Sequence, residues 1–123
     1  MDLRDEIVSV VRAGGPYRDN ARDMHYAVET ALHRCGWSTD REVRVDYRRD
    51  GRIGHVDIVA YRNGVSVAIE MDHRTPRKKS LAKLASLKGE VALRAVTLRS
   101  ECPPFVTDDG VVVFGAGIIG GEP

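Results

Sequence analysis

The segment GHVDIVAYRNGVSVAIEMD, from Gly54 to Asp72, decides the fold. It contains two runs rich in β-branched residues, which favour strands, on either side of Asn63-Gly64. Asn-Gly between alternating apolar residues is the strongest short signal for a hairpin with a two-residue turn. The segment therefore predicts an antiparallel pair of strands over residues 53–62 and 65–72.

The register of this hairpin brings two acids together. A two-residue turn pairs Arg62 with Val65, and the same register places Asp57 directly opposite Glu70. Because side chains alternate along a strand, these acids are expected to share one face of the sheet with His55 and Asp72. The other face is apolar, as a core face should be, and consists of Val56, Ile58, Ile69 and Met71.

Two carboxylates at directly opposed positions destabilise a sheet, because their Cβ atoms lie about 4.5–5.5 Å apart. The pair is tolerated if one carboxyl keeps its proton, if a basic side chain lies between the two, or if a divalent cation binds. Hard oxygen ligands at this separation suit Mg²⁺ or Mn²⁺. The basic candidate is Arg44, which a turn at Asp50-Gly51 would place across from Asp57. Geometry alone leaves open both a metal site and a polar surface that neighbouring charges neutralise.

The remaining elements predict an α/β fold. A short amphipathic helix at the N-terminus precedes a second helix over about residues 21–35, whose apolar residues recur at helical spacing. After the hairpin, Thr75 and Pro76 are typical of a helix N-cap and first helical position, and this helix is expected to end at about Lys88. The predicted order along the whole chain is two helices, three strands, a helix and two strands. The strands are predicted over residues 41–48, 53–62, 65–72, 91–99 and 110–115.

Composition points to one ordinary globular domain. The chain has 123 residues, 42% of them hydrophobic and 30% charged, so a single domain over residues 1–123 is expected. No apolar run approaches the roughly 20 residues of a membrane span, and the N-terminus lacks the apolar core of a secretory signal. The two cysteines have no CxxC spacing, which favours reduced thiols. A cytoplasmic protein without membrane contact is therefore expected.

Positive charge is concentrated in one place. The net charge is only +1, but six basic residues and no acidic one occur between Arg74 and Lys88, shortly after Glu70 and Asp72. Such a cluster suits the phosphates of a nucleic acid backbone. For any single lysine in it, a solvated helix face is the simpler interpretation.

The order of elements and the spacing of the acids resemble the PD-(D/E)xK, or restriction-endonuclease-like, nucleases. That resemblance rests on an α-β-β-β-α-β core with an Asp in its second strand and another acid thirteen residues later, near the end of the third. Here GHVDIVA contains the first acid, Asp57, and VAIEMD contains the second, Glu70. The resemblance covers roughly residues 21–98 and is most similar to archaeal-type Holliday junction resolvases and phage-encoded relatives. It implies a mixed central sheet flanked by helices.

The resemblance also implies a metal-dependent endonuclease that hydrolyses DNA phosphodiester bonds, with Mg²⁺ or Mn²⁺ as cofactor. Asp57 and Glu70 would hold the ion with the backbone carbonyl of Met71, and Glu29 in the upstream helix would bind it through water or complete a second site. The DNA would be double-stranded or branched, as in recombination and repair, and a homodimer would present two sites to two strands. Contacts to the DNA backbone are expected from Arg74, Arg77, Lys78, Lys79 and Lys83.

The motif departs from the family at one position. The family's lysine, two residues after the second acid, is Asp72 here, so the motif reads ExD rather than ExK. That lysine orients the attacking water and stabilises developing charge. Lys79 could supply the charge from the following helix, as could Arg74 or Lys78. Asp72 itself could act as a further metal ligand or as the base.

Two other interpretations stay open. The chain could be a DNA-binding protein of nuclease fold that lost catalysis together with its lysine, or an unrelated α/β domain whose acids are surface residues. A separate pattern, His25, Glu29 and His33 at i, i+4 and i+8, places three potential ligands on one helix face. Because no HExxH pattern accompanies it, a zinc site there is not favoured.

Overall fold

A computed structural model describes residues 1–15, 17, 20–46 and 53–116 of the chain. The predicted turn at Asp50-Gly51 and residues 117–123 lie outside the described residues. No helix within the described ranges is long and apolar enough to cross a membrane. The elements are α1 (Leu3–Ala13), α2 (Ala21–Arg34), β1 (Ser38–Val45), β2 (Gly54–Arg62), β3 (Val65–Asp72), α3 (Lys78–Ala85), β4 (Leu93–Leu98), β5 (Phe105–Val106) and β6 (Val112–Gly115).

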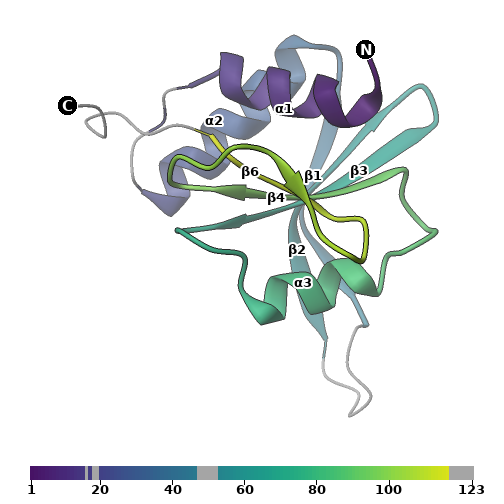
Figure 1. Cartoon of the computed structure of the whole chain (residues 1–123). Coiled ribbons are helices and arrows are strands. Elements are labelled where there is room, and N and C mark those ends of the chain that lie inside the picture. The colour runs from purple at the N-terminus through teal and green to yellow at the C-terminus, as the bar shows by residue number, and fades with distance from the viewer. Residues whose placement is uncertain (16, 18–19, 47–52, 117–123) are drawn as a thin grey trace.

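The strands form one mixed six-stranded sheet in the order β1-β2-β3-β4-β6-β5 (Figure 1). β2 is antiparallel to both of its neighbours, β3-β4 and β4-β6 are parallel, and β5 pairs antiparallel with β6. Parallel neighbours need a crossover connection, which α3 provides between β3 and β4. The helices α1 and α2 lie on one face of the sheet and α3 lies on the other (Figure 1). The fold is therefore of the predicted α/β class.

The two faces of the sheet bury separate apolar clusters. The cluster between the sheet and the helices α1 and α2 includes Ile7, Val11, Met24, Val28, Leu32, Ile58, Ile69 and Phe114. The cluster between the sheet and α3 includes Val56, Val59, Ala68, Leu84, Val96, Leu98 and Val113. Burial of such side chains is the main favourable term in folding, so each helical layer is held to the sheet by its own core.

The first two helices begin at capping side chains. The Asp2 carboxylate accepts a hydrogen bond from the Asp5 backbone N–H, and the Asn20 side chain accepts from the N–H groups of Arg22 and Asp23. These side chains satisfy donors that the first turn of a helix leaves without partners. The N-terminal amphipathic helix and the helix beginning at residue 21 are both confirmed as predicted.

The predicted hairpin is confirmed. β3 has the expected bounds, and Arg62 pairs with Val65 across a turn in which Asn63 and Gly64 have φ angles of 51° and 79°. A type I′ turn requires positive φ at both central positions, which is why Asn-Gly occurs there. The pairing continues in the expected register as far as Ile58 with Ile69.

The predicted apolar face of the hairpin is wrong at one residue. Ile58, Ile69 and Met71 pack under α1 and α2, but Val56 belongs to the cluster under α3. Strict alternation would place Val56 and Ile58 on the same face. The alternation is therefore interrupted at Asp57, which lies between them.

The predicted partner of Asp57 in β1 is also wrong. Arg44 pairs with His55, so the register differs from that of a two-residue turn at Asp50-Gly51. In the observed register, Glu42 occupies the place opposite Asp57. The basic side chain that was expected to neutralise Asp57 is thus replaced by a third acid.

The remaining differences concern element ends. The helix expected from Thr75 to Lys88 is shorter, because α3 begins after Arg77 and ends at Ala85. β1 begins at Ser38, before the predicted strand, and the two-residue strand β5 has no counterpart in the prediction. A strand of two residues is too short to give an alternating pattern in the sequence.

The core under α3 can be tested with two leucines of that helix. Leu84 is fully buried and Leu81 is only partly buried, so truncation of Leu84 should leave the larger cavity. We expect Leu84→Ala to lower the free energy of unfolding by about 2–5 kcal/mol. Leu81→Ala, the same change on the same helix, should cost clearly less. Equal losses in urea denaturation would contradict the packing described for α3.

Candidate active site

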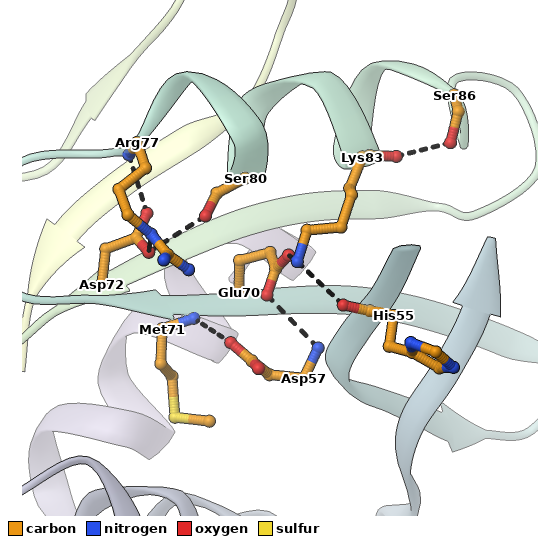
Figure 2. Close-up of polar contacts among 9 residues, drawn as sticks. All are labelled: His55, Asp57, Glu70, Met71, Asp72, Arg77, Ser80, Lys83 and Ser86. Carbon is orange, nitrogen blue, oxygen red and sulfur yellow. Dashed lines mark hydrogen bonds and ion pairs between the residues drawn. The ribbon is translucent and has the colours of Figure 1, made fainter. Parts of the chain in front are cut away.

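The candidate site lies where the two strands of the hairpin separate. Beyond Ile58, side chains replace the backbone hydrogen bonds between β2 and β3 (Figure 2). The Asp57 backbone N–H donates to Glu70 Oε2 at 3.3 Å, and Asp57 Oδ2 accepts from the Met71 N–H at 2.8 Å. Asp57 and Glu70 thus converge, but they are not the directly opposed pair on one face that was predicted: Asp57 lies in the gap between the strands and Glu70 lies on the side of α3.

Burial and the neighbouring acid make Glu70 difficult to ionise. Glu70 is fully buried, and burial together with hydrogen bonding and charge repulsion from Asp57 raises its pKa to about 8, against an opposing effect of Lys83. No described residue donates a well-oriented hydrogen bond to Glu70 Oε1, although Lys83 lies close to it. A buried carboxylate in this setting needs either a proton or more positive charge.

Lys83 is the basic group that reaches the acids. Its side chain is only 8% exposed, and its Nζ lies 2.5 Å from Glu70 Oε1 and donates to the His55 carbonyl at 2.8 Å (Figure 2). Lys79, the lysine predicted for this role, is exposed one helical turn earlier. The ammonium group therefore comes from the middle of α3, a position that the motif spacing did not indicate. The sequence had placed Lys83 only among the DNA-contacting residues.

Asp72 is used to hold α3. It is buried and accepts hydrogen bonds from the Arg77 backbone N–H at 2.9 Å, from Arg77 Nε at 2.8 Å and from Ser80 Oγ at 3.0 Å. Its carboxylate lies at the N-terminal end of the helix, where negative charge is favourable. The residue that replaces the motif lysine is thus occupied by Arg77 and Ser80 at the start of α3, which leaves little of its acceptor capacity for an ion or a base.

Glu29 lies in α2 and is held by three neighbours. It is buried, accepts a hydrogen bond from Thr39 Oγ1 at 2.8 Å, forms an ion pair with Arg41, and lies 3.3 Å from His25 Nε2. Glu29 is therefore tied to β1 and to the preceding turn of its own helix. Among these three partners, His25 also lies close to Asp57.

Most of the other predicted basic residues lie at the surface. Arg74, Lys78 and Lys79 are exposed around the start of α3. Arg77 is engaged with Asp72, and 60% of its side chain is exposed. These side chains are accessible to a polyanion close to the carboxylates, whereas buried Lys83 is not a surface contact.

The residues present suit a divalent cation. Two carboxylates lie together, and the Glu70 Oε1 atom is buried without a well-oriented hydrogen bond from the described residues. Met71 donates its N–H toward Asp57, and in a strand the carbonyl of the same residue points to the same edge. Oxygen ligands of this kind match Mg²⁺ or Mn²⁺. Lys83 already supplies one positive charge, so an ion would have to share Glu70 with it.

Comparison with known proteins bears on the fold. No family model and no curated protein matches the chain. It is similar to a solved structure described as "Crystal Structure of Protein of Unknown Function AF1548", with a TM-score of 0.53 and 18% sequence identity over 86% of this chain and 58% of that one. The chain therefore spans little more than half the length of that protein. At this identity the similarity concerns the α/β fold alone.

The raised pKa of Glu70 predicts a pH dependence of stability in the metal-free protein. Folding favours protonated Glu70, so its contribution is present in full below pH 4.5, declines as the pH rises, and is lost above a pH of about 8. At about 1.4 kcal/mol per pKa unit, the loss is on the order of several kcal/mol. Glu70→Gln should flatten this part of the profile, measured by urea denaturation in EDTA, whereas exposed Glu90→Gln should not. Parallel profiles for wild type and Glu70→Gln would contradict the assignment.

Proposed function

We propose that the protein is a metal-dependent endonuclease of the restriction-endonuclease-like type that hydrolyses phosphodiester bonds in DNA. The observation that supports this best is the convergence of Asp57 and Glu70 at the point where the hairpin opens, with Lys83 beside them. An isolated surface acid would have neither the partner carboxylate nor the buried ammonium group. The mixed sheet with helices on both faces is compatible with the core of that family.

Each residue at the opening has a role in this proposal. Asp57 and Glu70 would hold Mg²⁺ or Mn²⁺ with the Met71 carbonyl. Such an ion supplies an activated water and offsets charge on the phosphate. The Lys83 ammonium stabilises negative charge beside Glu70, as the missing motif lysine would do. Asp72 fixes the start of α3 and so positions Lys83.

The surface around the start of α3 would bind the DNA backbone. Arg74, Lys78 and Lys79 are exposed there and carry positive charge without an acidic residue between them in the sequence. Contacts of this kind fix the position of the duplex and weaken as salt rises, but they do not read base sequence. The proposal therefore includes a preference for DNA shape, such as branched DNA, over a particular sequence.

One observation favours a second candidate, a DNA-binding protein of nuclease fold without catalysis. Lys83 Nζ lies 2.5 Å from Glu70 Oε1, and a stable ion pair between this ammonium and the ionised carboxylate would exclude a cation. In this case the protein would bind DNA through the same basic surface. The two candidates separate on whether any divalent ion produces cleavage.

The first test of the proposed function uses Asp57. We expect the wild-type protein to cut linear, nicked, flap or four-way-junction DNA with Mg²⁺ or Mn²⁺. Asp57→Asn should reduce the cleavage rate at least about 100-fold, because mutation of residues that merely orient metal ligands already costs about 10–100-fold in activity. DNA binding in a gel-shift assay should persist. Asp108→Asn, in an exposed loop, is the matched control. A wild-type protein that shifts DNA and never cuts it would establish the second candidate.

The second test compares two lysines of α3. Lys83→Met should lower the rate constant of cleavage about 10²–10³-fold, the usual cost of removing one charge-stabilising donor, with little change in DNA affinity. Lys79→Met should instead weaken DNA binding and reduce its salt dependence by about one phosphate contact. If Lys79→Met lowered the rate constant of cleavage and Lys83→Met did not, the catalytic role would belong to Lys79 rather than to Lys83.

A further inference from the structure

Three potential metal ligands from different elements meet beside the proposed site. Ligand atoms of His25 in α2, Glu42 in β1 and Asp57 in β2 all lie within 4.8 Å of one another. Glu70 and Lys83, by contrast, lie on the side of α3 (Figure 2). Asp57 is therefore shared between two groups of polar residues, one toward α3 and one toward α2.

The backbone explains how Glu42 reaches this place. It lies opposite Asp57 in the register of β1 and β2, but the pair is missing from the ladder, which resumes at Val43 with Val56. Glu42 has a φ of 51°, in the left-handed region that non-glycine residues rarely adopt. The strand thus keeps its register on both sides while the Glu42 carboxylate is placed next to the Asp57 carboxylate.

His25 supplies a nitrogen ligand that is already oriented. Its side chain is 17% exposed, and no described residue forms a hydrogen bond with its buried Nε2 atom. Glu29 Oε1 lies 3.3 Å from that atom and is itself fixed by Arg41 and Thr39. A carboxylate beside one ring nitrogen of an imidazole favours the proton there and leaves the other ring nitrogen for a metal, as in histidines that bind metals.

We propose that His25, Glu42 and Asp57 bind a divalent transition-metal ion, next to the ion held by Asp57 and Glu70. Two carboxylates and a neutral imidazole offset the charge of such an ion, and the imidazole favours a transition metal over Mg²⁺. The inference rests on the proposed function only for the role of the ion in DNA cleavage. Binding of the ion itself depends on the three side chains and can be measured without DNA.

Mn²⁺ is the probe for this site, because it is paramagnetic and pulsed EPR detects the ¹⁴N coupling of a bound imidazole. With the metal-free full-length chain and no DNA, we expect Mn²⁺ to bind with a ¹⁴N coupling from one imidazole. His25→Ala should abolish this coupling and raise the Mn²⁺ dissociation constant at least about tenfold. His33→Ala, an exposed histidine of the same helix, should leave the coupling intact.

A second variant tests the oxygen ligand without risk to the core. Glu42 is exposed, so Glu42→Gln should keep the fold, and it should weaken Mn²⁺ binding about tenfold or more. Glu90→Gln, another exposed glutamate, is the matched control. The dissociation constant for Mg²⁺ should change less than twofold in His25→Ala, since Mg²⁺ takes oxygen ligands.

The possible outcomes separate this inference from the proposed function. Mn²⁺ that binds without a nitrogen coupling, or whose coupling survives His25→Ala, overturns the inference and leaves the nuclease proposal standing. A wild-type protein that does not bind Mn²⁺ also overturns it. A histidine-coupled Mn²⁺ site in a protein that never cuts DNA supports the site and contradicts the nuclease.

Discussion

The separation of β2 from β3 beyond Ile58 is the feature on which the rest of the site depends. Up to that pair the hairpin forms a regular ladder, and beyond it the Asp57 carboxylate takes the place of a backbone acceptor for the Met71 N–H. A ladder that continued would place the two acids side by side on the face that α3 covers. Because the strands separate, Asp57 lies between them and contacts groups on both sides of the sheet.

Local signals in the sequence predicted the frame of the site well. The Asn63-Gly64 turn fixed the register of the hairpin, and the register placed Asp57 against Glu70, since a two-residue turn leaves no freedom in the pairing. The order of helices and strands followed from periodicity, with only β5 missing. These features depend on residues close together in the chain, which is why a single sequence contains them.

The parts that could not be predicted depend on contacts between distant segments. Lys79 and Lys83 are one turn apart on α3, and only the position of the helix over the sheet decides that Lys83 reaches Glu70. Likewise Glu42, rather than Arg44, lies opposite Asp57, because the β1–β2 register is not that of a two-residue turn. Asp72 stands at the lysine position of the motif, yet it binds Arg77 and Ser80 at the start of α3, a use that the motif spacing alone cannot reveal.

The approach of Lys83 to Glu70 means that, once Glu70 loses its proton, the protein contains its own counter-ion at the place where a divalent cation would bind. A cation entering there competes with the ammonium group for the same carboxylate, so its intrinsic affinity is reduced by whatever it costs to displace Lys83. A phosphate group nearby offers the ammonium a new partner. On the proposed function, ion and substrate therefore assist one another, and by thermodynamic reciprocity each strengthens the binding of the other by the same factor.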